Sequence, residues 1–163
     1  MSRRGLTWQA LCVEESRTAY VAVVGAGADV TPAVLAAAQS VGALLARRGA
    51  VVVTGGLGGV MEAACRGARE AGGATLGILP GADRAAANRW VSVAVATGMG
   101  ELRNGLVVRA SDAVIAIAGE YGTLSEIALA LKLGRRVVGL GTWEIHGVAR
   151  ATDPAAAVEL ALG

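Results

Sequence analysis

Two glycine-rich turns carry the residues whose types and spacing could do chemistry in this sequence. The first covers residues 54–62 (TGGLGGVME) and the second residues 118–126 (AGEYGTLSE), and each follows a β-branched, apolar run. A strand that ends in glycines lets backbone N–H groups approach a ligand, and the following helix directs the positive end of its dipole at the same point. Two such turns in one chain predict a site for a phosphorylated ligand, with a nucleotide as the leading candidate.

The candidate binding residues lie in these turns and in a third glycine-containing segment, residues 25–27 (GAG), which ends an earlier apolar run. They are Gly25, Gly27, Thr54, Gly55, Gly56, Gly58, Gly59, Met61, Glu62, Gly119, Glu120, Tyr121, Gly122 and Thr123. The glycines could simply permit tight turns, but six in two corresponding turns are more than chain reversal requires. For Glu62 two roles stay open, a ligand contact or a favourable acid at a helix N-terminus.

The elements that position these turns follow from the hydrophobic pattern. Strands are predicted over residues 20–24, 50–54, 74–79, 90–96, 113–117 and 137–140, and helices over 32–48, through 62–69, over 101–110 and 124–133, and from 154 onward. Apolar strands that alternate with amphipathic helices indicate a parallel sheet covered on both faces. We therefore expect an α/β fold, a Rossmann-like parallel sheet of about six or seven strands with helices on both faces. The ligand should lie beyond the carboxyl ends of the strands.

The length of 163 residues fits one domain, which we place at residues 20–163 behind an N-terminal extension at residues 1–19. Residues 6–13 of that extension would add an edge strand or remain loosely ordered. Residues 82–89 are expected to form a solvated loop. The tryptophans Trp90 and Trp143 are expected in the core or in an interface rather than as stacking partners.

Composition excludes several functional classes. Hydrophobic residues make up 54% of the chain, but no apolar run reaches the roughly 18 residues of a membrane span, so we expect no membrane partner and a cytoplasmic location. A net charge of +2 and 3% aromatic residues argue against nucleic acid as a partner. The lone thiols Cys12 and Cys65 and the single His146 predict no metal site.

Two common nucleotide-binding motifs are not met. Residues 25–27 resemble the start of the dinucleotide fingerprint, but Val30 stands where its third glycine belongs. The second strand ends in Thr54, where an acid would bind the ribose. The sequence also has no Gly-Lys-Ser/Thr of a P-loop. A dehydrogenase and a P-loop protein are therefore both disfavoured.

The two turns resemble a known family. Residues 54–62 resemble the GGGxxGxM turn, and residues 118–126 the PGGxGTxxE turn, of the LOG-type Rossmann proteins, long mislabelled lysine decarboxylases. The resemblance covers about residues 20–142. The intervening segments 77–80, 87–88, 97–99 and 103–104 look closer to the branch that contains the molybdenum cofactor carrier proteins.

For its enzymatic members, the family implies hydrolysis of nucleoside 5′-monophosphates to base and ribose 5-phosphate. Arg103 and Glu126 match the family's catalytic arginine and glutamate. A carboxylate can stabilise an oxocarbenium-like transition state, and an arginine can hold a phosphate through its planar fork. Ala118, Glu120 and Asn104 depart from the family pattern, and the bulk and charge of Glu120 should alter or partly repel a simple monophosphate.

Each of these two residues also has a structural alternative. Residues 123–126 (TLSE) form a capping-box pattern, in which Glu126 would bond the amide of Thr123, and both roles could coexist. Arg103 could be a solvated residue in the first turn of its helix.

The sequence thus supports three functional hypotheses. The first is a protein that binds a nucleotide or pterin phosphate, including the molybdenum cofactor that it would carry. The second is a nucleoside 5′-monophosphate phosphoribohydrolase, and the third is a nucleotide-sensing oligomer. We expect a phosphorylated small molecule as the ligand and a homodimer or higher homo-oligomer, with residues 101–110 and 124–133 in the interface.

Overall fold

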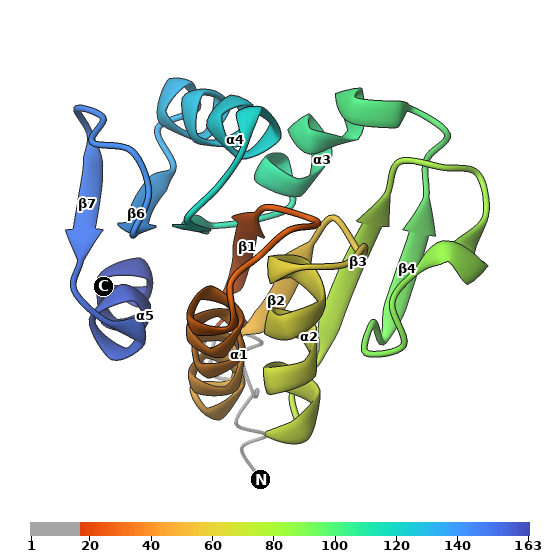
Figure 1. The fold of residues 1–163 in the computed structure, drawn as a ribbon, viewed down its shortest axis with the longest axis horizontal. Coiled ribbons are helices and arrows are strands. Elements are labelled where there is room, and N and C mark those ends of the chain that lie inside the picture. The colour runs from red at the N-terminus through yellow and green to blue at the C-terminus, as the bar shows by residue number, and fades with distance from the viewer. Residues whose placement is uncertain (1–16) are drawn as a thin grey trace, which may run out of the picture.

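Seven strands form one parallel sheet in the computed structural model, which describes residues 17–163 (Figure 1). The predictions for residues 6–13 and Cys12 lie outside the described residues. The sheet order is β4-β3-β2-β1-β5-β6-β7. The strands are β1 (Tyr20–Gly25), β2 (Val51–Thr54), β3 (Thr75–Leu79), β4 (Val93–Ala96), β5 (Ala113–Ile117), β6 (Arg136–Leu140) and β7 (Val148–Ala151). The predicted α/β class is confirmed.

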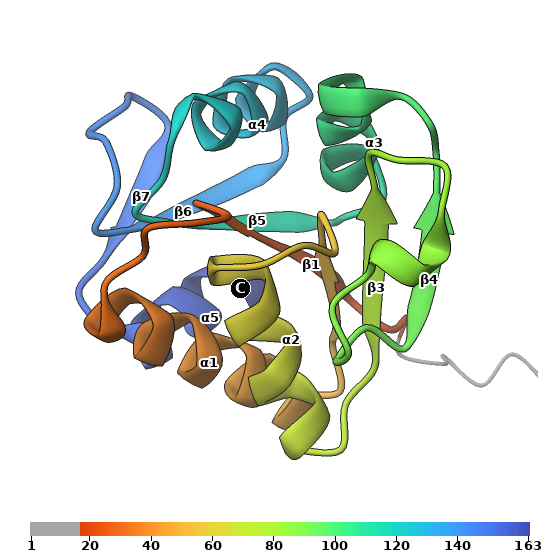
Figure 2. The same cartoon turned by 45° about the vertical axis from the view of Figure 1, so that its right-hand side comes forward.

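Helices cover both faces of the sheet (Figure 2). One face carries α1 (Pro32–Arg47), α2 (Val60–Glu70) and α5 (Pro154–Leu162), and the other carries α3 (Asn104–Arg109) and α4 (Tyr121–Lys132). Two short 3₁₀ helices, η2 (Arg84–Ala86) and η3 (Gly100–Arg103), lie in connections. Successive strand residues pack into the cores on opposite faces of the sheet. In β1, Val21 and Val23 belong to the core on the first face, and Ala22 and Val24 to the core on the second. No described helix is long and apolar enough to span a bilayer.

The sheet has a switch point between β1 and β5. From β1 the chain moves outward through β2, β3 and β4, and then returns to the other side of β1 as β5, where Val24 pairs with Ala116. Connections leave β1 and β5 in opposite directions, so a crevice opens beyond their carboxyl ends. The turns after β1, β2 and β5 all reach this edge (Figure 2).

Several element boundaries correct the sequence prediction. β7 was not predicted, because it is a four-residue edge strand whose partly exposed residues give no buried run. β4 is shorter than residues 90–96, and the predicted helix at 101–110 divides into η3 and α3. The start of α1 is confirmed: Thr31 is its N-cap and Pro32 its first residue, and Thr31 Oγ1 accepts from the N–H of Val34 at 3.4 Å.

Candidate functional site

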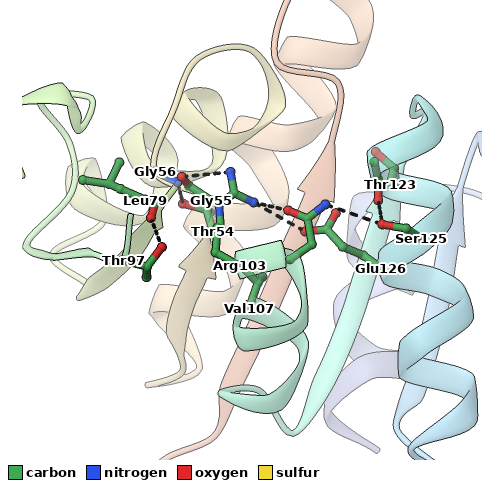
Figure 3. A network of polar contacts seen from close by, with 12 residues as sticks. Thr54, Gly55, Gly56, Leu79, Thr97, Arg103, Val107, Thr123, Ser125 and Glu126 are labelled. Carbon is green, nitrogen blue, oxygen red and sulfur yellow. Dashed lines mark hydrogen bonds and ion pairs between the residues drawn. The ribbon is translucent and has the colours of Figure 1, made fainter. Parts of the chain in front are cut away.

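Arg103 lies at the carboxyl edge of the sheet, at the end of η3, and is only 7% exposed. Its Nη2 donates to the carbonyl of Gly55 at 3.4 Å, and its Nη1 donates to Oδ1 of Asn104 (Figure 3). A Cβ at position 55 would lie 2.4 Å from Nη2 of Arg103, so a larger residue there would displace the guanidinium. The first glycine turn and Arg103 therefore form one unit, and the solvated alternative for Arg103 is wrong.

Glu126 approaches the same guanidinium from α4 and is also 7% exposed (Figure 3). Its Oε1 lies 4.0 Å from Nη1 of Arg103, within ion-pair range but too far for a hydrogen bond. Burial raises the pKa of Glu126 to about 7, against the opposing effect of the positive Arg103. Within residues 17–163 this carboxylate accepts no hydrogen bond, and Nε of Arg103 has no acceptor.

The capping alternative for Glu126 is wrong, because α4 begins three residues earlier than predicted. Its N-cap is Glu120, whose N–H donates to Thr123 Oγ1 at 3.4 Å. Ala118 and Gly119 both have positive φ angles, 47° and 135°, and this lets the chain turn into the helix early. Glu126 consequently lies in the second turn of α4, facing Arg103 rather than the helix end.

A cavity of about 210 Å³ opens above this ion pair, and we call it the Arg103 pocket. Eight predicted residues line it, drawn from four parts of the chain: Gly25, Gly55, Met61, Arg103, Glu120, Gly122, Thr123 and Glu126. It also includes Leu57, Pro80, Glu101 and Asn104, which the site prediction did not include. Glu101 and Asn104 lie within two residues of Arg103 in the sequence, and this proximity is the one local signal that could have predicted their place in the pocket.

The other predicted residues lie elsewhere, and ligand contacts for them stay predictions. Thr54 is fully buried, and its Oγ1 accepts from the N–H of Gly56 at 3.1 Å. Tyr121 is 89% exposed. A second cavity is lined by Gly27, Gly59 and Glu62, a third by Gly119, and Gly58 packs near the carbonyl of Gly27.

Each of the two predicted anion sites has one carboxylate at its helix N-terminus. The N-terminus of α4 carries the carboxylate of its own N-cap, Glu120, which faces the Arg103 pocket. The N-cap of α2 is Gly59, with a φ of 62°, and the carboxylate of Glu62 lies in the first turn of that helix. The positive charge that favours an anion therefore comes from Arg103, the one basic side chain among the described residues that line the Arg103 pocket.

The family comparison matches residues 18–160 to the model described as LDcluster4, SLOG cluster4 family. The chain belongs to the SLOG cluster4 family. This confirms the LOG-type resemblance inferred from the two turns. An uncharacterized protein of Archaeoglobus fulgidus is 45% identical to this SLOG chain over 120 residues, which cover 74% of this chain and 78% of the relative.

Solved structures similar to this SLOG protein include two whose described function concerns the molybdenum cofactor. The molybdenum cofactor binding protein of Rippkaea orientalis is 38% identical, with a TM-score of 0.83 over 89% of this chain and 96% of that one. The molybdenum cofactor carrier protein of Chlamydomonas reinhardtii is 34% identical, with a TM-score of 0.79 over 88% and 95%. These neighbours match the branch that the intervening segments indicated.

Proposed function

We propose that this protein binds a phosphorylated heterocycle, a pterin or nucleoside phosphate, and carries it without turnover, with the molybdenum cofactor as its cargo. The observation that carries the proposal is the buried Arg103 guanidinium, held at the switch point between Gly55 and Glu126. Burying a charge is costly unless partners compensate it. The 4.0 Å gap to Glu126 and the unpaired Nε leave that compensation incomplete until an anion binds.

The size of the Arg103 pocket supports binding of one end of a ligand. At about 210 Å³ it is smaller than the roughly 300–1,000 Å³ that usually encloses a whole drug-sized molecule. A phosphate with its adjoining sugar or pyran ring is a suitable occupant. Backbone N–H groups at the first glycine turn and the Arg103 fork then hold the phosphate oxygens.

The likeness to cofactor carriers supports the choice of cargo. The similarity covers nearly the full length of both neighbours, so it extends over the whole domain rather than a shared core. Carriage requires tight binding without bond cleavage. The carboxylate of Glu120 at the second turn disfavours an ordinary monophosphate placed there and so fits a protein that does not process nucleotides.

A phosphoribohydrolase is the second candidate function, and the raised pKa of Glu126 favours it. A carboxyl group with a pKa of about 7 can exchange a proton at neutral pH, as a general base must. Its ionised form, next to Arg103, could stabilise an oxocarbenium-like centre and orient water. The three departures from the family motif predict that any such hydrolysis is slow.

Calorimetric titration with AMP, GMP and ribose 5-phosphate, alongside chromatography for released base, tests the proposal. We expect saturable binding that is weakened at least tenfold in Arg103→Ala, and no released base. Arg109→Ala removes an exposed arginine from α3, the helix that follows Arg103, and serves as the control. Equal affinity in the Arg103→Ala and Arg109→Ala variants would contradict binding at Arg103, and sustained release of base would replace the carrier by the hydrolase.

A further inference from the structure

A second cavity, which we call the Trp90 pocket, borders the same first glycine turn as the Arg103 pocket. It encloses about 410 Å³ and lies between the loop after β1, the facing sides of α1 and α2, and the connection from β3 to β4. Its walls include Asp29, Leu35, Gly59, Glu62, Arg66 and Trp90. The proposed carrier function does not use this cavity.

Trp90 is held at the glycine turn by a chain of hydrogen bonds. Its backbone N–H donates to Oδ1 of Asn88 at 3.0 Å, and Nδ2 of Asn88 donates to the carbonyl of Leu57 at 2.9 Å. The N–H of Asn88 also donates to the carbonyl of Gly56 at 2.9 Å. On the other side of the residue, Thr75 Oγ1 donates to the carbonyl of Trp90 at 2.7 Å. These bonds fix the backbone of Trp90 beside the first glycine turn, at the end of a loop that is largely exposed, as expected.

The walls of the Trp90 pocket combine stacking surface with polar groups. The guanidinium of Arg66 lies 5.8 Å from the centroid of the half-buried indole and is fixed by Glu70, whose Oε1 accepts from its Nε at 2.8 Å. Leu35 adds an apolar surface. The Glu62 carboxylate has no ion-pair or hydrogen-bond partner among the described residues, so it is free to accept N–H groups.

We propose that the Trp90 pocket is a second binding site, which takes a planar heterocycle bearing N–H or amino donors, such as a purine or pterin ring. The ring stacks on Trp90, because aromatic side chains bind the faces of heterocycles, and its donors pair with Glu62. At about 410 Å³ the cavity has room for a bicyclic ring, for which the Arg103 pocket is small. The inference extends the proposed function to another cavity and does not require phosphate binding at Arg103.

Fluorescence of Trp90 tests this site directly. The double variant Trp8→Phe/Trp143→Phe leaves Trp90 as the one tryptophan in the sequence. Guanosine, which has the ring and its donors but no phosphate, should quench this emission saturably, with a dissociation constant below about 1 mM. Ribose 5-phosphate, which has no heterocycle, should leave it unchanged. This choice of probes separates failure at the Trp90 pocket from failure of phosphate binding.

Two matched acids test the role of Glu62. In the same background, Glu62→Gln should weaken guanosine binding about tenfold, since a hydrogen bond to a charged acceptor is replaced by a neutral one. Glu159→Gln, on the exposed side of α5, should leave it unchanged. Absence of saturable quenching in a protein with a native circular dichroism spectrum would overturn the proposal. An equal response of the two glutamine variants would overturn it as well.

Discussion

Nη1 of Arg103 and Oε1 of Glu126 lie 4.0 Å apart, each on a side chain that is more than nine-tenths buried. They come from different elements, η3 and α4, and meet at the one edge of the sheet where strand order reverses. A buried pair without a direct hydrogen bond is a weak source of stability, because desolvation offsets the Coulombic attraction. Stability alone therefore does not account for the pair, which is consistent with the proposed ligand.

Glu126→Gln tests whether this carboxyl group acts in catalysis. If the protein hydrolyses AMP, the reaction should be slow, and the substitution should abolish it while circular dichroism stays native. The amide keeps the shape of the side chain but loses the charge that stabilises an oxocarbenium ion, an effect of about 3 kcal/mol or more in a preorganised site. Adenine release is followed by chromatography. Unchanged turnover in the variant would remove Glu126 from the chemistry.

The raised pKa of Glu126 predicts a pH dependence of folding stability. Between its ordinary value of 4.5 and about 7, the native state binds a proton that the unfolded chain has released, so this group's stabilising contribution is lost as pH rises through that window. Each unit of pKa difference corresponds to about 1.4 kcal/mol. Urea unfolding at pH 5 and pH 8 should therefore show a larger loss in wild type than in Glu126→Gln. Identical losses would contradict the assignment.

Glu120→Gly should increase affinity for nucleoside monophosphates about three- to tenfold, because it removes a negative charge from the wall of the Arg103 pocket. Glu120 has an extended backbone, φ −127°, which glycine adopts readily. Glu120→Gln separates charge from size, and it should recover much of the gain. Calorimetric titration with AMP measures all three proteins. Weaker binding by both variants would indicate that Glu120 contacts the ligand favourably.

The face that carries α3 and α4 should mediate self-association. Leu102 is 78% exposed, Leu106 36% and Tyr121 89%, and the β4 residues Val93 and Val95 are 57% and 44% exposed. Apolar exposure of this extent indicates an interface. Light scattering at micromolar concentration should report a dimer or larger species for wild type and a smaller one for Leu102→Ser. Leu160→Ser, on α5, is the matched control. A wild-type mass of 16 kDa alone would contradict this prediction.

Local sequence signals predicted most of the sheet, whereas Arg103 and Glu126 were identified as site residues only through the family resemblance, and their ion pair was not predicted. Apolar runs marked the buried strands, and Thr31-Pro32 marked the start of α1, because both signals are contained within a few residues. The start of α4 was missed, since Glu120 caps it through a turn that depends on the positive φ of Ala118 and Gly119. The positive φ of Ala118 could not be expected from the sequence, because alanine seldom adopts such angles.

Contacts between distant parts of the chain could not be predicted from the sequence, for a different reason. The bond from Asn88 to Leu57 that positions Trp90 joins residues 31 positions apart and crosses from one loop to another. Hydrophobic periodicity reports which side chains face the core, but not which polar groups meet at a sheet edge. The Trp90 pocket therefore emerged only from the three-dimensional arrangement.

Native mass spectrometry of the freshly purified protein tests the central claim most directly, that a phosphorylated heterocycle is carried at Arg103. We predict an adduct whose released mass and fragments identify a pterin or nucleoside phosphate, recovered intact after incubation at 25 °C. The adduct should be lost in Arg103→Ala and retained in Arg109→Ala. A wild-type protein that shows no adduct, even after incubation with molybdenum cofactor, AMP or GMP, would contradict the account.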